Sequence, residues 1–204
     1  MFRGPFRLAA VVLAFELLSL VLSTHTPNGK AYFPKYQFYH NLSKLNECLY
    51  EFSAHNPEIV DVEFRHRSRW GQAQYLVHLT NLSAYERGER LAEKARILIS
   101  AGEHGREFLP VETALSLIKN LTSSYKLPSS SAVGNTTRFI LNHVDLYIVV
   151  ILNPDGRSLV ENSGEFCSST TVNGVDLNVE LDKRLRHWDG GGSAVRRVLS
   201  GRFG

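Results

Sequence analysis

Two side chains near the middle of the chain have the types and spacing of a metal site. His104 and Glu107 are three residues apart, so they can face the same way around one helical turn. Zinc binds His nitrogen and Glu oxygen at about 2.0–2.2 Å, and a catalytic zinc has three protein ligands and a water. The alternative is a helix-start glutamate facing the helix dipole, with His104 only nearby. The pair alone favours this alternative, because a chain with 8 histidines contains one by chance about every second time.

The flanking residues predict the elements that position this pair. Residues 97–99 are an apolar run typical of a buried strand. From Val111 onward the apolar spacing is helical, and Pro110 fits the first helical turn, where its missing N–H costs nothing. We therefore expect His104 and Glu107 at a strand-to-helix junction.

The rest of the chain predicts helices alternating with strands. We expect a helix over about residues 42–55 capped by Asn41 or Ser43, a hairpin of strands 60–64 and 75–79, a helix over 108–121, an exposed linker over 125–137, and a buried strand over 144–152 that ends in a turn at 153–156. His66 and His78 lie on or beside the hairpin strands and are interpreted as structural or surface residues. This order predicts an α/β fold with a mixed sheet between helices.

The N-terminus indicates secretion. Arg3 and Arg7 precede an apolar run over residues 8–22 that is short for a bilayer span, and Ser23 suits signal-peptide cleavage. A retained membrane anchor is the alternative. Four Asn-x-Ser/Thr acceptor sites for glycans follow, at Asn41, Asn81, Asn120 and Asn135. The two cysteines, Cys48 and Cys167, could pair outside the cell, but they form no metal-binding motif.

Four motifs in a fixed order carry a resemblance to a known family. They are a hairpin turn at 67–71, Gly-Glu-His-Gly-Arg-Glu at 102–107, Asn-Pro-Asp-Gly at 153–156 and Asn-Gly-Val-Asp-Leu-Asn at 173–178. Between about residues 39 and 178 the chain resembles the zinc metallocarboxypeptidases of the carboxypeptidase A type. The resemblance reverses the interpretation of His104 and Glu107, because a chance pair would lack the other motifs. It also implies a mixed eight-stranded sheet between helices.

The resemblance implies a role for each matching residue. His104 and Glu107 would be two of three zinc ligands, and Asp176 would hold the other ring nitrogen of the histidine. Asn178 would bind the terminal carboxylate of a substrate, and Arg106 would line the substrate groove. The implied reaction removes the last residue of a peptide, with zinc as cofactor and peptide or protein C-termini as partners. We expect no nucleic acid partner and no stable membrane association.

The chain departs from the family pattern after Asn178. Val179 stands where the family has an arginine, and Arg157 follows Gly156 too early to be the family's oxyanion arginine. The third ligand, the catalytic glutamate and a substrate-binding tyrosine would fall past Gly204, and the polar, glycine-rich surroundings of His187 do not favour a ligand. Residues 1–179 are balanced in charge, so residues 180–204 hold the whole net charge of +3.

We therefore expect three segments: a signal peptide at 1–23, a partial catalytic domain at 36–179 whose C-terminal part is missing, and an atypical basic tail at 180–204. No long propeptide is expected before the domain. Three functions remain open: a metallocarboxypeptidase that is truncated and inactive as given, a non-catalytic secreted domain that binds peptides or partners, and a fragment with no stable fold.

Overall fold

The computed structural model describes residues 35, 37–83, 94–164, 166 and 169–180. Its helices and strands, in chain order, are α1 (Leu42–His55), β1 (Val60–Arg67), β2 (Ala73–Leu79), β3 (Ala95–Ser100), α3 (Phe108–Tyr125), α4 (Ala132–His143), β4 (Val144–Val149) and α5 (Pro154–Ser163). The predicted signal peptide, Cys167 and almost all of the predicted tail lie outside the described residues. No helix within the described part is long and apolar enough to cross a membrane.

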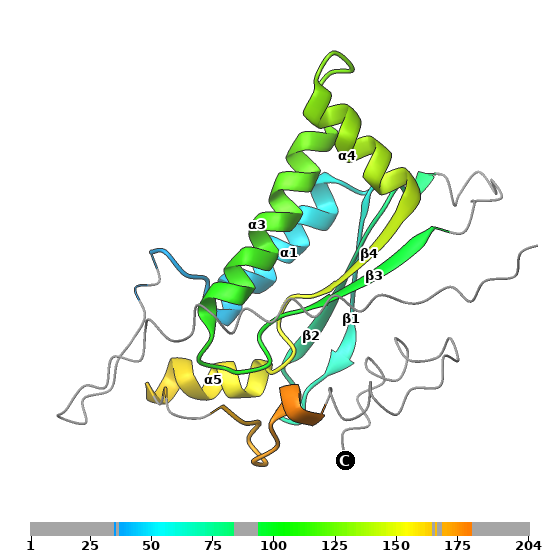
Figure 1. Cartoon of the computed structure of the whole chain (residues 1–204). Coiled ribbons are helices and arrows are strands. Elements are labelled where there is room, and N and C mark those ends of the chain that lie inside the picture. Colours follow the sequence, from blue (N-terminus) through cyan, green and yellow to red (C-terminus); the bar gives the residue numbers. More distant parts are fainter. Residues whose placement is uncertain (1–34, 36, 84–93, 165, 167–168, 181–204) are drawn as a thin grey trace, which may run out of the picture.

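The strands form one mixed sheet in the order β1-β2-β4-β3 among the described residues. β1 pairs antiparallel with β2, β2 antiparallel with β4, and β3 parallel with β4. The predicted hairpin and mixed sheet are thus confirmed. Because β3 and β4 are parallel, the loops that follow them both start at the same end of the sheet, where the two strands have their carboxyl ends. Figure 1 shows residues 101–107, α5 and residues 169–180 gathered at this end.

α1 and α3 cover one face of the sheet and build the main core (Figure 1). α1 runs from Leu42 as predicted, and the Asn41 side chain accepts the Lys44 N–H at 2.9 Å, so Asn41 is the cap. Helical spacing buries one stripe of each helix: Leu45 and Leu49 on α1, and Val111, Leu115 and Ile118 on α3. A smaller apolar cluster contains Leu76, Val149, Leu152 and Leu177. The core therefore fixes the strand ends from which the site residues project.

The prediction of an exposed linker over residues 125–137 is wrong, because α3 runs to Tyr125 and α4 begins at Ala132. The Ser131 hydroxyl accepts the Gly134 N–H at 3.2 Å, which caps α4. α4 buries Thr137 and Leu141, one turn apart. Its first half is rich in Gly, Asn and Thr, which have low helix propensity, so the composition concealed the helical spacing.

The predicted turn at residues 153–156 is the first turn of a helix that the sequence interpretation did not include. Asn153 caps α5 by accepting the Gly156 N–H at 2.9 Å, and Pro154 occupies the first helical position. Proline fits there because its missing N–H would have no helical partner. Asn, Pro, Asp and Gly correctly indicated a turn at residues 153–156, but Asn and Pro are also common at the start of a helix.

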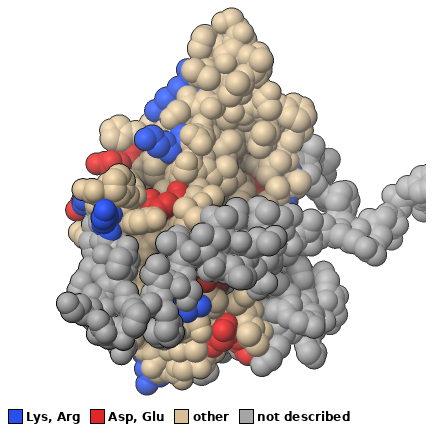
Figure 2. Space-filling view, turned by 60° about the vertical axis from the view of Figure 1, so that its left-hand side comes forward, with Lys and Arg blue, Asp and Glu red and all other residues tan. Residues whose placement is uncertain are grey.

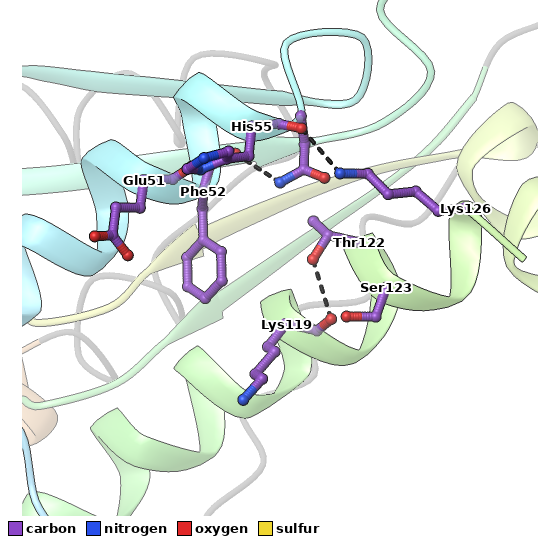
Figure 3. Close-up of a pocket in the computed structure, with 8 residues that line it drawn as sticks. Glu51, Phe52, His55, Lys119, Thr122, Ser123 and Lys126 are labelled. Atoms are coloured by element: carbon purple, nitrogen blue, oxygen red, sulfur yellow. Dashed lines mark hydrogen bonds between the residues drawn. The ribbon is translucent and has the colours of Figure 1, made fainter.

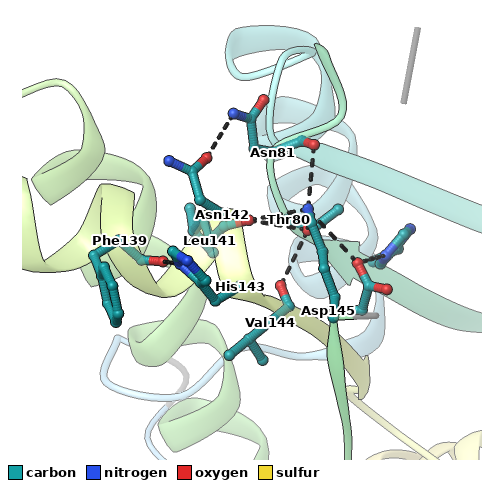
Figure 4. A network of polar contacts seen from close by, with 10 residues as sticks. Thr80, Asn81, Phe139, Leu141, Asn142, His143, Val144 and Asp145 are labelled. Carbon is teal, nitrogen blue, oxygen red and sulfur yellow. Dashed lines mark hydrogen bonds and ion pairs between the residues drawn. The ribbon is translucent and has the colours of Figure 1, made fainter. Parts of the chain in front are cut away.

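A buried polar network closes the opposite end of the sheet (Figure 4). The Lys94 amine donates to Thr80 Oγ1 at 2.6 Å and to the Leu141 carbonyl at 3.2 Å, and it lies 4.0 Å from Asp145. Only 2 % of the Lys94 side chain is exposed, and burial lowers its pKa despite the attraction of Asp145. His78 stacks on Tyr147 and lies 3.4 Å from Asp145, which agrees with the structural role predicted for it.

The end of the molecule formed by α4 and the α3–α4 connection has few charged groups in view (Figure 2). Val133 and Phe139 on α4 are exposed there. The candidate site residues lie at the other end of α3, near its first turn.

Candidate metal centre

His104 lies between two carboxylates at the start of α3. Its Nδ1 is 2.9 Å from Glu107 Oε1, and its Nε2 is 3.4 Å from Asp176 Oδ1. The strand-to-helix junction predicted for the pair is confirmed: β3 ends at Ser100, and Glu107 directly precedes α3. The fold thus brings together three residues that the sequence analysis singled out, one of them 72 positions away.

The two carboxylates favour the protonated form of the His104 ring. The hydrogen bond to Glu107 is the main reason why the pKa of His104 is raised; burial opposes it, and Asp176 adds to it. Burial acts to raise the pKa of Asp176, but the Val179 N–H and His104 outweigh it, so this pKa is lowered. Asp176 therefore faces the ring as a carboxylate.

Backbone groups hold Asp176 in place. Its Oδ1 accepts the N–H of Asn178 at 3.1 Å and that of Val179 at 3.2 Å. The Asp176 carbonyl also accepts the Glu180 N–H at 3.1 Å. A carboxylate bound to the next backbone groups in this way caps a helical turn. The backbone N–H groups of Asn178 and Val179 thus fix the direction of the Asp176 carboxylate.

Asn153 ties the two loops of this site together. Its amide donates to the Glu103 carbonyl at 3.1 Å and to the Thr170 carbonyl at 3.2 Å, and its backbone N–H donates to the Gly102 carbonyl at 2.9 Å. The residue is 3 % exposed. The sequence pattern predicted only a turn at Asn153, although its place in a matching motif was a usable signal.

Two glycines allow the loops to approach. A Cβ added at Gly105 would overlap the backbone of Gly156 and Arg157. Gly102 has φ +67°, and a side chain there would also press on Ile151. The segment that carries His104 can therefore lie directly against the start of α5.

The β1–β2 turn is fastened to the same end of the sheet. Asp155 accepts hydrogen bonds from the Ser68 hydroxyl and, at 3.1 Å, from the Trp70 N–H. Gly71 in this turn has φ +79°. Two of the motifs that carried the family resemblance thus contact each other through a buried aspartate.

The predicted groove residues differ from Arg157 in exposure. Arg106 and Asn178 are exposed. Arg157 is 1 % exposed, donates to the Glu107 carbonyl at 3.1 Å and lies over the Phe108 ring, 3.4 Å from its centroid. Arg157 therefore packs against the beginning of α3 and supports it.

A pocket between α1 and α3 lies at the other end of α3 (Figure 3). Its lining includes Phe52, His55, Lys119 and Lys126. The Lys126 amine donates to the His55 carbonyl at 3.0 Å, so it caps the carboxyl end of α1. None of the predicted site residues lines this pocket.

The His104 and Glu107 donor set fits zinc. Imidazole nitrogen and carboxylate oxygen are both zinc ligands, and a carboxylate on the other ring nitrogen is the usual support of a zinc-bound histidine. Two ligand atoms at a tetrahedral zinc are about 3.4 Å apart, so the 2.9 Å pair would need to open by about half an ångström. Within the described residues, no group of three or more His, Cys, Asp or Glu side chains could hold a metal ion.

Comparison with known proteins decides the family. The family model described as zinc carboxypeptidase matches residues 45–196, and so continues past Asn178. The chain belongs to the zinc carboxypeptidase family. It is 26% identical to a zinc carboxypeptidase of Saccharothrix mutabilis subsp. capreolus over 171 residues, which are 80% of this chain. It is also 26% identical to carboxypeptidase A1 of Bos taurus over 87% of this chain. The chain spans 37% of the length of each relative.

Solved structures confirm the carboxypeptidase-like fold of this family member. A metallo-carboxypeptidase from Burkholderia cenocepacia matches with a TM-score of 0.52 and 21% identity, over 70% of this chain and 33% of the other. The carboxypeptidase A from Helicoverpa armigera matches with a TM-score of 0.50 and 18% identity, over 63% of this chain and 28% of the other. The described sheet thus corresponds to part of a carboxypeptidase fold.

Proposed function

We propose that this zinc carboxypeptidase family member provides the first half of a site that releases C-terminal residues from peptides or proteins. The observation that carries the proposal is the His104 imidazole between Glu107 and Asp176, 2.9 Å and 3.4 Å away. His104 and Glu107 are the zinc ligands of this proposal. Zinc bound there supplies a Lewis acid for the scissile carbonyl and lowers the pKa of a bound water.

The other residues of the half-site orient the ligands and the substrate. With zinc bound, Asp176 would accept the Nε2 proton of His104, so that the Nδ1 lone pair could bind the metal in place of the hydrogen bond to Glu107. Asn153 holds the loop that carries both ligands against the loop that leads to Asp176, through the Glu103 and Thr170 carbonyls. Arg106 and Asn178, both exposed, are the substrate contacts of this proposal.

Hydrolysis requires groups that the chain does not supply in a matching context. By the family resemblance, the third ligand and the catalytic glutamate would lie beyond residue 204, and Val179 stands where an arginine would bind the substrate carboxylate. Two protein ligands hold zinc less firmly than three. We therefore propose that the chain as given binds zinc weakly and does not turn over peptides.

The proposed location is outside the cell. It is supported by the signal-like residues 1–23 and by the exposure of two predicted glycan acceptors, Asn120 and Asn135. The Asn81 amide donates to Asn142 Oδ1 at 2.7 Å and the Asn135 amide donates to the Ser129 carbonyl at 2.8 Å, so both amides are occupied in the fold, and Asn41 Oδ1 caps α1. We propose that the exposed Asn120 carries a glycan.

A non-catalytic peptide-binding role is the second candidate. It is favoured by the same half-site, because the exposed Arg106 and Asn178 could bind a peptide C-terminus without any hydrolysis. The two candidates differ in whether a complete active site forms when the missing groups are supplied.

Zinc affinity and peptide release test the proposal together. The purified secreted chain is titrated with zinc against a chromogenic chelator, beside His104→Ala, Glu107→Gln and Asp176→Asn. We expect His104→Ala and Glu107→Gln to abolish the binding, and Asp176→Asn to weaken it about tenfold. His55→Ala, which removes an exposed histidine on α1, is the matched control.

Peptides ending in apolar, basic and acidic residues are then incubated with the zinc-loaded chain. No amino acid release is expected. Zinc binding that ignores His104 would refute the metal site, whereas chelator-sensitive release of terminal residues would refute the proposed inactivity.

A further inference from the structure

A thiol, an imidazole and a carboxylate meet where residue 40 packs against α3, and they share no residue with the candidate metal centre. Glu112 on α3 accepts two hydrogen bonds from His40, one from its backbone N–H at 2.6 Å and one from Nδ1 at 2.8 Å. His40 Nε2 lies 3.6 Å from Cys48 Sγ on α1. This is the order of a nucleophile, a base and a group that orients the base.

The hydrogen bonds determine which ring nitrogen of His40 can act as a base. An ionised carboxylate only accepts hydrogen bonds, so Nδ1 must carry the proton that Glu112 receives. In the neutral ring Nε2 then has a lone pair, and Nε2 is the atom that faces Cys48 Sγ. Because Glu112 also binds the His40 backbone, the ring is held at two points.

Without a base, Cys48 would be an unreactive thiol. Burial is the main reason why its pKa is raised, and Glu51, Glu112 and Glu47 add to this, whereas Lys119 opposes it. The thiol is therefore protonated at neutral pH, and a protonated thiol is not a nucleophile. An adjacent base that removes the proton during attack would overcome this barrier.

We propose that Cys48 is a thiol–disulfide exchange site for low-molecular-weight disulfides, with His40 as its base and Glu112 as the residue that positions His40. Cys48 Sγ transfers its proton to His40 Nε2 and attacks one sulfur of the disulfide. A new S–S bond joins Cys48 to that half of the reagent while the original S–S bond breaks. The second half leaves as a thiolate and takes the proton back from His40. The products are a mixed disulfide on Cys48 and one free small thiol.

The chemistry of the site points to a small disulfide as the reagent. Cys48 has a free thiol that is only partly exposed, so a bulky reagent would reach it poorly. His40 is 34 % exposed on the side chain, which leaves a route to solvent beside the sulfur. Disulfides of small thiols are the oxidants of the extracellular compartment that the N-terminus predicts.

The test measures mixed-disulfide formation on the full chain carrying Cys167→Ser, so that Cys48 is the single thiol. Oxidised glutathione is the probe, and intact mass follows the reaction at pH 7. His40→Gln keeps a donor for Glu112 but has no basic nitrogen, and we expect it to slow the reaction at least about tenfold. Glu112→Gln should have a smaller effect in the same direction, and His55→Ala should have none.

A pH series separates base catalysis from a change of access. The parent chain should already react below the pH range in which the thiol ionises, whereas His40→Gln should react only as the thiol itself ionises, which burial moves to higher pH by raising the pKa of Cys48. Circular dichroism melts confirm that each variant is folded. If His40→Gln does not fold, His40→Ala takes its place. A reaction of His40→Gln or Glu112→Gln that is as fast as that of the parent chain, or faster, would overturn the proposal. So would a Cys48–Cys167 disulfide in the unsubstituted chain, because the thiol would not be free.

Discussion

The two ends of the β3–β4 pair carry polar groups of opposite character. At the amino ends, the Lys94 amine and Asp145 are almost fully buried, with side chains 2 % and 4 % exposed. At the carboxyl ends, His104 and Asp176 are 15 % and 34 % exposed. Buried polar groups must form their hydrogen bonds with one another, whereas partly exposed groups can exchange a protein partner for a ligand.

The anchoring of the two groups differs in the same way. The Lys94 amine bonds to residues at the ends of β2 and α4, which belong to the packed core. His104 and Asp176 lie on loops, and Asn153 holds those loops through backbone carbonyls. One strand pair thus provides stability at one end and chemistry at the other, as expected where rigid strands position loop residues.

The largest effect is expected from Lys94→Met. The substitution leaves Thr80, the Leu141 carbonyl and Asp145 without a buried cation, which should lower the free energy of unfolding by about 3 kcal/mol. Urea denaturation measures the loss, with Lys44→Met on the exposed surface as control. Zinc affinity should stay within about twofold of the parent value. A parallel loss of zinc affinity would show that the two ends are coupled.

Asn153→Asp should affect both stability and zinc binding. The aspartate can still accept the Gly156 N–H, but it cannot donate to the Glu103 and Thr170 carbonyls. We expect unfolding to be easier by about 1–2 kcal/mol and zinc affinity to fall at least about tenfold. Asn41→Asp, which changes the cap of α1 in the same way, is the control for charge at a helix start. If zinc affinity followed stability alone, Asn153 would be only a structural residue.

The smallest effect is expected from Glu161→Gln on α5, at the site end of the sheet. Burial is the main reason why the pKa of Glu161 is raised, although the Leu42 N–H and Arg157 oppose it. A raised folded-state pKa means that its contribution to stability is present below the unfolded pKa and lost as pH rises through the folded value.

The neutral glutamine has no such loss. The Glu161→Gln variant should therefore be more stable than the parent at pH 7, by less than about 1 kcal/mol, and equal to it below about pH 4. Thermal melts at both pH values measure the difference. A variant that is less stable at pH 7 would show that the carboxylate bound to the Leu42 N–H stabilises the fold.

The sequence predicted the elements whose spacing is strongly periodic. α1, the β1–β2 hairpin and the strand-to-helix junction of His104 follow from apolar spacing that burial enforces. The sequence did not predict α4, because residues 131–137 have the composition of a loop. Ser131 is the cap of this helix and Thr137 is buried against the core, and neither role follows from the local sequence. The ligand roles rest on the family motifs, since a His-x-x-Glu spacing alone is a common chance event.

The contacts of Asn153 and His40 were beyond reach of the sequence. Asn153 belongs to a turn-like tetrapeptide, and nothing local indicates that its amide bonds to a carbonyl 50 positions away. The His40–Glu112 contact spans 72 positions and belongs to no motif. Such pairs depend on how α1 and α3 lie together, which local pattern does not determine. Cys48 is a free thiol among the described residues, and Cys167 lies outside them.

The position of β4 has a consequence for how the chain folds. β4 is the last of the described strands in sequence, yet it lies between β2 and β3. During synthesis the β1–β2 hairpin can form early, but β3 can pair with β4 only after residue 149 has emerged from the ribosome. Until then the apolar residues 97–99 have no strand partner. We expect β3 to gain hydrogen-exchange protection only with β4, and a nascent chain that stops before residue 144 to be a target for chaperones.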